Sequence, residues 1–238
     1  MSGVLFAAIA GLANIIGGAA ILAPGRRHGP HLEGLFGFGA GFMLAVALLE
    51  MAPHAVQLRG GFMAILAGYL IVHLTQHVLT PHFHFGEETH SEAMVSRGVG
   101  VLALLGLVPH SFFDGVALAG GFLESQQLGL LIFLAIVLHK VPTGVSLASI
   151  MVASGNTRRN SFLAVALVAV ATVAGAAATP LIRPLATYGL ALATGVTIYV
   201  AASNLIPESQ RQRSWIAQVG VFVGVIAFLL VRLMLPGT

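Results

Sequence analysis

The sequence predicts an all-α integral membrane protein with eight transmembrane helices, and composition is the first observation behind this prediction. The chain has 238 residues, of which 57% are hydrophobic and only 8% are charged, and its mean hydropathy is +0.95. Soluble domains carry about 25% charged residues, so this composition is typical of a bilayer protein. The apolar runs are also continuous, without the alternation of membrane β-strands. We therefore expect a single transmembrane domain over residues 1–238.

Apolar runs of spanning length are the second observation, since a helical span needs about 20 apolar residues. The predicted spans cover residues 3–23, 33–57, 61–80, 98–123, 127–153, 161–181, 184–206 and 214–235. Arginines follow the first run and do not precede it, unlike the basic segment of a signal peptide, so we interpret it as a retained span.

The distribution of arginines is the third observation, and it predicts the orientation. The loops after spans 1, 3, 5 and 7 contain Arg26, Arg27, Arg97, Arg158, Arg159, Arg211 and Arg213, whereas the other side has Arg59, Arg183 and Arg232. Cytoplasmic loops carry the excess of basic residues, so we expect both termini to be extracytoplasmic. The short loops and the lack of a targeting segment indicate a prokaryotic plasma (inner) membrane. No basic stripe is present, and nucleic acid is not an expected partner.

Two near-copies of one motif lie in spans 4 and 5. Residues 110–115 read HSFFDG and residues 139–144 read HKVPTG. In each, the residue four positions after the histidine shares its helix face. Consecutive spans run in opposite directions, so the copies form an inverted repeat, as in transporters with a mid-membrane site. Residues 50–54 and 204–208 form a fainter pair, each with polar residues four apart and a proline before the second.

Packing of spans 4 and 5 through these faces would bring His110, Asp114 and His139 together, with Thr143 nearby. Two imidazoles and a carboxylate suit Zn²⁺ with an open coordination position, and equally Fe²⁺. The alternative for each histidine is a structural hydrogen bond to a carbonyl of a neighbouring helix. Asp114 is the strongest marker of a site, because a mid-membrane carboxylate needs a cation or a proton. The chain has no cysteine, which excludes thiolate ligands.

Other ionisable residues accompany this motif. Lys140 lies inside span 5, and we expect it to pair with Asp114 or Glu208; the alternative is a desolvated lysine that carries protons. Glu50 and Glu208 lie near span ends, where they either relay the ion or reach water at the interface. Both interpretations remain open from the sequence.

Histidines also gather in and before the polar segment 81–97, the predicted cytoplasmic loop between spans 3 and 4. The loop contains three glutamates, and the histidines there and just before it are His73, His77, His82, His84 and His90. Such a tract either captures divalent metal weakly or is an ordinary solvated loop.

At these residues the chain resembles the ZIP family of divalent-metal transporters. Residues 110–115 are similar to the family's span-4 motif His-Asn-x-x-Asp/Glu-Gly, and residues 139–144 are similar to its span-5 motif His-x-x-Pro-Glu-Gly. Residues 204–208 are similar to a span-7 segment that ends in Pro-Glu. The resemblance extends over essentially the whole chain. It implies uptake of Zn²⁺, Fe²⁺ or Mn²⁺ toward the cytoplasm, frequent homodimers, and a bundle containing spans 4 and 5 that slides against a scaffold.

The resemblance also implies roles for single residues. His110, Asp114 and His139 match primary metal-ligand positions, and Thr143 would be auxiliary. Ser111, Lys140 and Glu208 match positions of a second, adjoining metal site. Further candidates for that site or for the pathway are Asn204, Glu50 and His54.

Three departures from the family pattern modify this expectation. Thr143 replaces a bridging glutamate, Lys140 places a cation where a second metal would bind, and Glu50 and His54 reverse the usual order of histidine then glutamate. With fewer carboxylates, we expect one bound metal and weaker or altered metal selectivity.

The sequence therefore predicts a transporter of a divalent transition metal, zinc first, that works by alternating access without an organic cofactor and is not an enzyme. Its expected partners are the metal ion, the lipid bilayer and a second copy of the chain. One alternative is a membrane metal sensor that binds without transport. Another is an intramembrane metallohydrolase, which is disfavoured because the chain lacks His-Glu-x-x-His and a glutamate base beside the histidines.

Overall fold

The computed structural model describes residues 2–23, 30–76, 97–207 and 215–234, and all regular structure in these ranges is helical. The prediction of an all-α membrane protein is confirmed. The elements are α1 (Ser2–Leu22), α2 (Pro30–Val46), the π-helical η1 (Ala47–Met51), α3 (Ala52–Gln57), α4 (Gly61–Leu74), α5 (Arg97–Glu124), α6 (Gln126–Ala153), α7 (Arg158–Ala178), α8 (Arg183–Tyr199), the π-helical η4 (Val200–Leu205) and α10 (Trp215–Met234).

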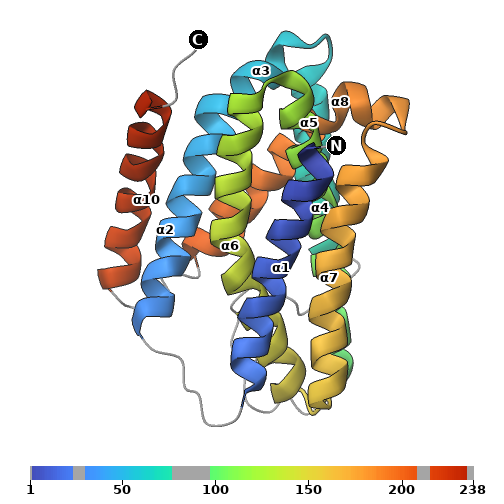
Figure 1. Cartoon of the computed structure of the whole chain (residues 1–238), viewed down its shortest axis with the longest axis vertical. Coiled ribbons are helices and arrows are strands. Elements are labelled where there is room, and N and C mark those ends of the chain that lie inside the picture. The colour runs from blue at the N-terminus through green and yellow to red at the C-terminus, as the bar shows by residue number, and fades with distance from the viewer. Residues whose placement is uncertain (1, 24–29, 77–96, 208–214, 235–238) are drawn as a thin grey trace.

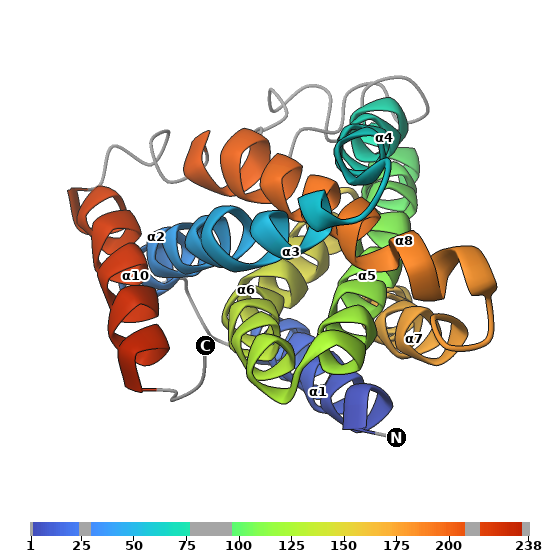
Figure 2. The ribbon, with the colours of Figure 1, turned by 90° about the horizontal axis from the view of Figure 1, so that it is seen from above.

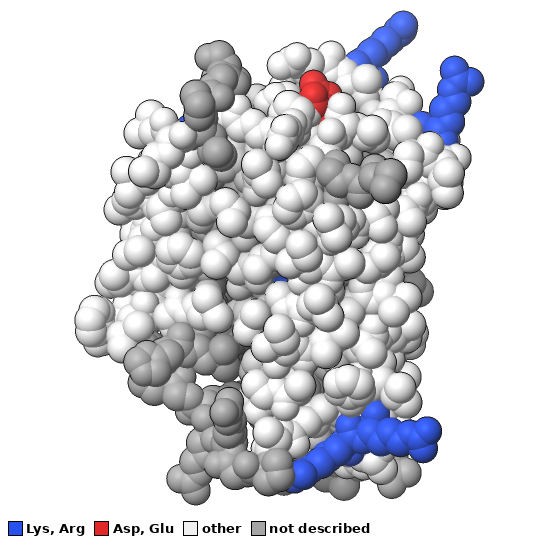
Figure 3. All heavy atoms as spheres, in the orientation of Figure 1, with Lys and Arg blue, Asp and Glu red and all other residues white. Residues whose placement is uncertain are grey.

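The helices coincide with the predicted spans to within a few residues at most ends. Within the described ranges, 7 helical stretches are long and apolar enough to cross a membrane, and α4 is a shorter apolar helix that covers most of the predicted span 61–80. Figure 3 shows charged side chains at the two ends of the visible face and an almost uncharged belt between them. This distribution is that of a protein whose middle lies in hydrocarbon.

Successive helices run up and down the bundle, so α1 begins and α10 ends at the same end (Figure 1). The outer ends of the first and last described helices therefore lie on one side of the bundle. Which side faces the cytoplasm stays a prediction from the arginines.

Glycines allow direct backbone contact between α6 and α1 and between α5 and α7. A Cβ atom on Gly144 would lie 2.0 Å from the Asn14 carbonyl oxygen, and one on Gly115 would lie 1.9 Å from that of Thr172. Such close approach is how small residues hold membrane helices together. Gly115 and Gly144 end the two sequence motifs, so the repeat has a structural counterpart: α5 packs on α7 as α6 packs on α1.

The same kind of contact joins α2 to α10 and α4 to α8. A Cβ on Gly41 would lie 1.9 Å from the Val221 carbonyl oxygen, and Gly195 makes a similar approach to α4. Between α2 and α6 the fit is looser, since a Cβ on Gly39 would lie 3.5 Å from the Leu138 oxygen. The helices thus form a site bundle (α1, α5, α6 and α7) and a companion bundle (α2, α4, α8 and α10), which Figure 2 shows from above.

The two π-helical segments occupy equivalent places before a proline. Segment η1 ends two residues before Pro53, and η4 ends two residues before Pro207. Proline lacks an amide hydrogen and clashes with the preceding turn, and a wider π turn accommodates it. The faint sequence pair therefore begins, at Glu50 and at Asn204, within a π-helical segment in each copy. By contrast, Pro109 and Pro142 lie inside α5 and α6 without a π segment.

Candidate metal site

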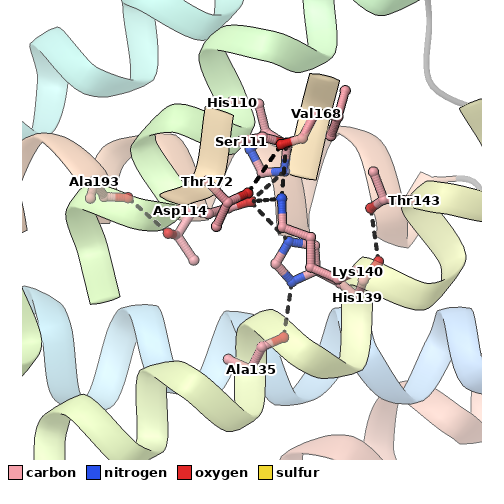
Figure 4. Close-up of polar contacts among 11 residues, drawn as sticks. His110, Ser111, Asp114, Ala135, His139, Lys140, Thr143, Val168, Thr172 and Ala193 are labelled. Carbon is pink, nitrogen blue, oxygen red and sulfur yellow. Dashed lines mark hydrogen bonds and ion pairs between the residues drawn. The ribbon is translucent and has the colours of Figure 1, made fainter. Parts of the chain in front are cut away.

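Helices α5 and α6 pack side by side and bring three ionisable side chains together (Figure 4). His110 and Asp114 come from one face of α5, and His139 comes from α6. Their possible ligand atoms all lie within 4.8 Å of one another, and each residue is at most 2% exposed. Among the described residues, His110, Asp114 and His139 form one group of histidine and acidic side chains that is close enough together to hold a metal ion. The predicted convergence of these three residues is present in the structure.

Asp114 Oδ2 is the atom on which the group centres. The Nε2 atoms of His110 and His139 each lie 3.4 Å from it. Ligands of a tetrahedral zinc ion, with bonds of about 2.0–2.2 Å, are separated by roughly 3.3–3.5 Å. The nitrogen–oxygen separations are therefore of the size that a zinc ion between these atoms requires.

The two imidazoles are held differently. His139 Nδ1 donates a hydrogen bond of 2.9 Å to the Ala135 carbonyl oxygen one turn back, which turns Nε2 toward Asp114 Oδ2. Such a hydrogen bond commonly orients a metal-binding histidine. His110 Nδ1 is buried without a hydrogen-bond partner. The orientation of His110 therefore depends on packing and on its contact with Asp114.

Lys140 pairs with Asp114, one of its two predicted partners. Its Nζ atom lies 2.8 Å from Asp114 Oδ2 and 2.8 Å from Ser111 Oγ, and the residue is 0% exposed. The other predicted partner, Glu208, lies outside the described residues. One carboxylate and one ammonium group thus face each other inside the bundle, and their formal charges cancel.

Thr143 is buried but its hydroxyl takes no part in this group. Its Oγ1 donates a hydrogen bond of 2.8 Å to the His139 carbonyl oxygen, and Figure 4 shows it turned away from Asp114. A threonine within a helix often bonds the carbonyl four residues back, which sequence spacing alone does not reveal.

Glu50, in η1, and His54, in α3, lie on the continuation of α2 and so belong to the companion bundle. The Glu50 carboxylate is buried and forms an ion pair of 2.5 Å with Arg232 Nε of α10, while His54 Nδ1 contacts the Glu50 carbonyl oxygen at 2.7 Å. The sequence left open whether Glu50 relays the ion or reaches water. Its carboxylate is not exposed, and among the described residues it makes no contact with Asp114. Arg232 is a partner that the sequence reasoning missed, although it is a charged residue within an apolar span.

Asn204, in η4, is buried and donates a hydrogen bond of 3.1 Å to Gln76 Oε1 beyond the end of α4. Gln76 was also missed, and its only signal was a polar residue late in an apolar run. His73 is exposed on α4 and its ring meets that of Tyr199, with centroids 5.9 Å apart. The remaining histidines proposed for metal capture lie outside the described residues: His77, His82, His84 and His90.

A comparison with known protein families assigns the chain. The family model of the ZIP zinc transporter matches residues 84–232, more than half of the sequence and including both near-copies of the motif. The chain belongs to the ZIP zinc transporter family. No curated protein sequence matches it significantly. Membership makes this ZIP protein a multi-pass membrane protein, in agreement with its long apolar helices, and implies divalent-metal transport.

Proposed function

We propose that this ZIP protein carries a divalent transition metal ion, Zn²⁺ ahead of Fe²⁺ or Mn²⁺, across the membrane toward the cytoplasm. His110, Asp114 and His139 are its ligands. The observation that carries the proposal is the convergence of two imidazole nitrogens on one buried carboxylate oxygen, each at 3.4 Å. Imidazole nitrogens favour zinc over Mg²⁺ or Ca²⁺. Three protein ligands leave a coordination position open, which suits an ion that must also leave.

The cargo would move with the site bundle. All three ligands belong to α5 and α6, and the backbone contacts at Gly115 and Gly144 attach these helices to α7 and α1. The ligand side chains are closed off from solvent, so part of the protein must move before an ion reaches them, and a shift of the two bundles relative to each other would open the site. The looser fit at Gly39, between α2 and α6, supports movement at that boundary. Alternating access of this kind is a described class of transporter motion.

The orientation, the membrane and the oligomeric state are further parts of the proposal. The arginine distribution supports extracytoplasmic termini and inward transport. We also propose a prokaryotic plasma membrane, from the short loops, and a homodimer, from the family resemblance. The cytoplasmic loop 81–97 would capture the ion near the exit.

A metal sensor that binds without transport is the second candidate function. The observation that favours it is the ion pair between Lys140 and Asp114, because the ammonium group occupies a carboxylate oxygen that the metal would need. A sensor and a transporter would both bind zinc, but only a transporter would give flux.

Zinc flux into proteoliposomes separates these functions. We would measure flux with the parent protein, with Asp114→Ala, and with Thr179→Ala as a control that removes a buried hydroxyl bonded to the Gly175 carbonyl. Fe²⁺, Mn²⁺ and Cd²⁺ as competitors would rank the metals. Saturable flux that is lost in Asp114→Ala and kept in the control supports the transporter. Zinc binding without flux in the parent protein supports the sensor.

A further inference from the structure

Lys140 neutralises Asp114 from within the same bundle. Its ammonium group contacts Asp114 and Ser111, both on α5, and Lys140 itself is on α6. In the described part of the chain, no ion pair joins Asp114 to the companion bundle. The neutralising charge would therefore travel with the site in any movement between the bundles.

An empty site without this lysine would contain a buried, uncompensated carboxylate. Asp114 is 2% exposed, and His110 and His139 supply no formal charge to balance it when both imidazoles are neutral. Burying an unpaired ion is strongly unfavourable in the low dielectric of a protein interior or a bilayer. With Lys140 in place, the charges of its ammonium group and of the Asp114 carboxylate cancel.

Lys140 and a metal ion would compete for the same atom. The Nζ of Lys140 and the Nε2 atoms of both histidines all approach Asp114 Oδ2, at 2.8, 3.4 and 3.4 Å. A dication bound by Oδ2 and the two imidazoles would lie beside the ammonium group and repel it. Ser111 Oγ offers the displaced ammonium group a second partner, at 2.8 Å in the present arrangement.

We propose that Lys140 is a built-in substitute cation, which takes the place of the metal on Asp114 and lets the empty site bundle return across the membrane without a co-transported ion. This inference rests on the proposed transport function. The inference predicts different effects on two transport modes, net uptake and metal-for-metal exchange. Net uptake over many turnovers requires the empty carrier to return, whereas exchange of metal for metal does not.

The test compares these modes in proteoliposomes with radioactive zinc. Net uptake is measured into metal-free vesicles, exchange is measured into vesicles loaded with unlabelled Zn²⁺, and zinc affinity is measured on the purified protein. The variants are Lys140→Leu, which removes the charge and adds no ligand, and Lys140→Arg, which keeps the charge. Arg232→Leu is the matched control, because it breaks an ion pair to the buried carboxylate of Glu50 in the companion bundle.

We expect Lys140→Leu to bind zinc about tenfold more tightly or better, because the competing cation is gone. Its net uptake should fall about tenfold or more while exchange persists, so the ratio of net uptake to exchange falls. Lys140→Arg should keep a ratio closer to that of the parent, and Arg232→Leu should leave the ratio unchanged.

An unchanged ratio in Lys140→Leu, or an equal fall of the ratio in Arg232→Leu, would overturn the inference. If the parent protein shows neither mode, the proposed transport function fails instead. Should Lys140→Leu not yield folded protein, Ser111→Ala tests the same pair. Loss of that hydroxyl leaves the displaced ammonium group without its second partner, so zinc binding should weaken, and unchanged binding would count against the substitute-cation role.

Discussion

The hydroxyl of Thr143 and the carbonyl oxygen of His139, one helical turn earlier, are joined by a hydrogen bond of 2.8 Å. The hydroxyl proton is thereby donated within α6, and the hydroxyl oxygen is turned away from Asp114. We expect Thr143→Ala to change zinc affinity by less than about threefold, as a loss of local helix hydrogen bonding would. Calorimetric titration with Zn²⁺ measures this. A loss as large as that of His139→Ala would show that the hydroxyl is a metal ligand after all.

His110 supplies one of the two nitrogens at 3.4 Å from Asp114 Oδ2. Its replacement in His110→Ala removes a ligand that no described neighbour replaces, so zinc affinity should fall by at least about tenfold and uptake should be abolished. Flux in proteoliposomes, with size-exclusion chromatography to confirm folded protein, checks this. Uptake at the level of the parent protein would remove His110 from the site.

Lys140 occupies the place where the family resemblance implies a second metal. Lys140→Ala vacates that space beside Asp114 and Ser111, and we expect the variant to bind more metal per chain than the parent protein. Elemental analysis of dialysed protein gives the number of ions per chain. The same stoichiometry in both proteins would mean that Lys140 does not block a second site.

The glycine contacts predict different outcomes for two similar substitutions. In Gly144→Ala the new Cβ would meet the Asn14 carbonyl oxygen at 2.0 Å, so helix α1 must move. We expect a loss of about 1–3 kcal/mol in the free energy of unfolding. In Gly39→Ala the nearest atom would be at 3.5 Å, an ordinary contact, and stability should hardly change. Thermal unfolding in detergent measures both, and equal stability of the two variants would contradict the close contact of α1 with α6.

The ion pair between Glu50 and Arg232 can be tested by a double-mutant cycle. Arg232→Leu leaves a buried carboxylate without its partner and should destabilise the protein by about 1–3 kcal/mol, less than for a fully buried pair because Arg232 is partly exposed. Combination with Glu50→Gln should restore most of this loss. The absence of any restoration would show that the pair is not coupled. A loss of flux in the stable double variant would place Glu50 in the metal pathway.

Much of the fold follows from the sequence because hydrophobic length is a local property. Continuous apolar runs fix where helices lie, and the spacing of four between His110 and Asp114 fixes their common face. The meeting of these residues with His139 was predicted from the repeated motif, which placed both histidines at equivalent depths in adjacent spans.

The remaining features depend on tertiary contacts or on local competition for hydrogen bonds. The partner of Lys140 was left open between Asp114 and Glu208, because spacing does not say which carboxylate lies across the helix interface. The position of the Thr143 hydroxyl depended on its bond to its own helix. The pairing of Glu50 with Arg232 joins spans 2 and 8, which no sequence pattern related.

The π turns at η1 and η4 have a mechanical consequence. A π turn holds an extra residue, so the side chains beyond it lie about 100° away from the face that an uninterrupted α-helical pattern would give them. Along residues 30–57, α2 packs mainly against α10 and α6, whereas α3 packs against α8 and α4. One continuous helical stretch thus presents its two segments, α2 and α3, to different neighbouring helices. Deleting a single residue within 47–51 would turn the side chains of α3 away from α8, although composition and length would hardly change.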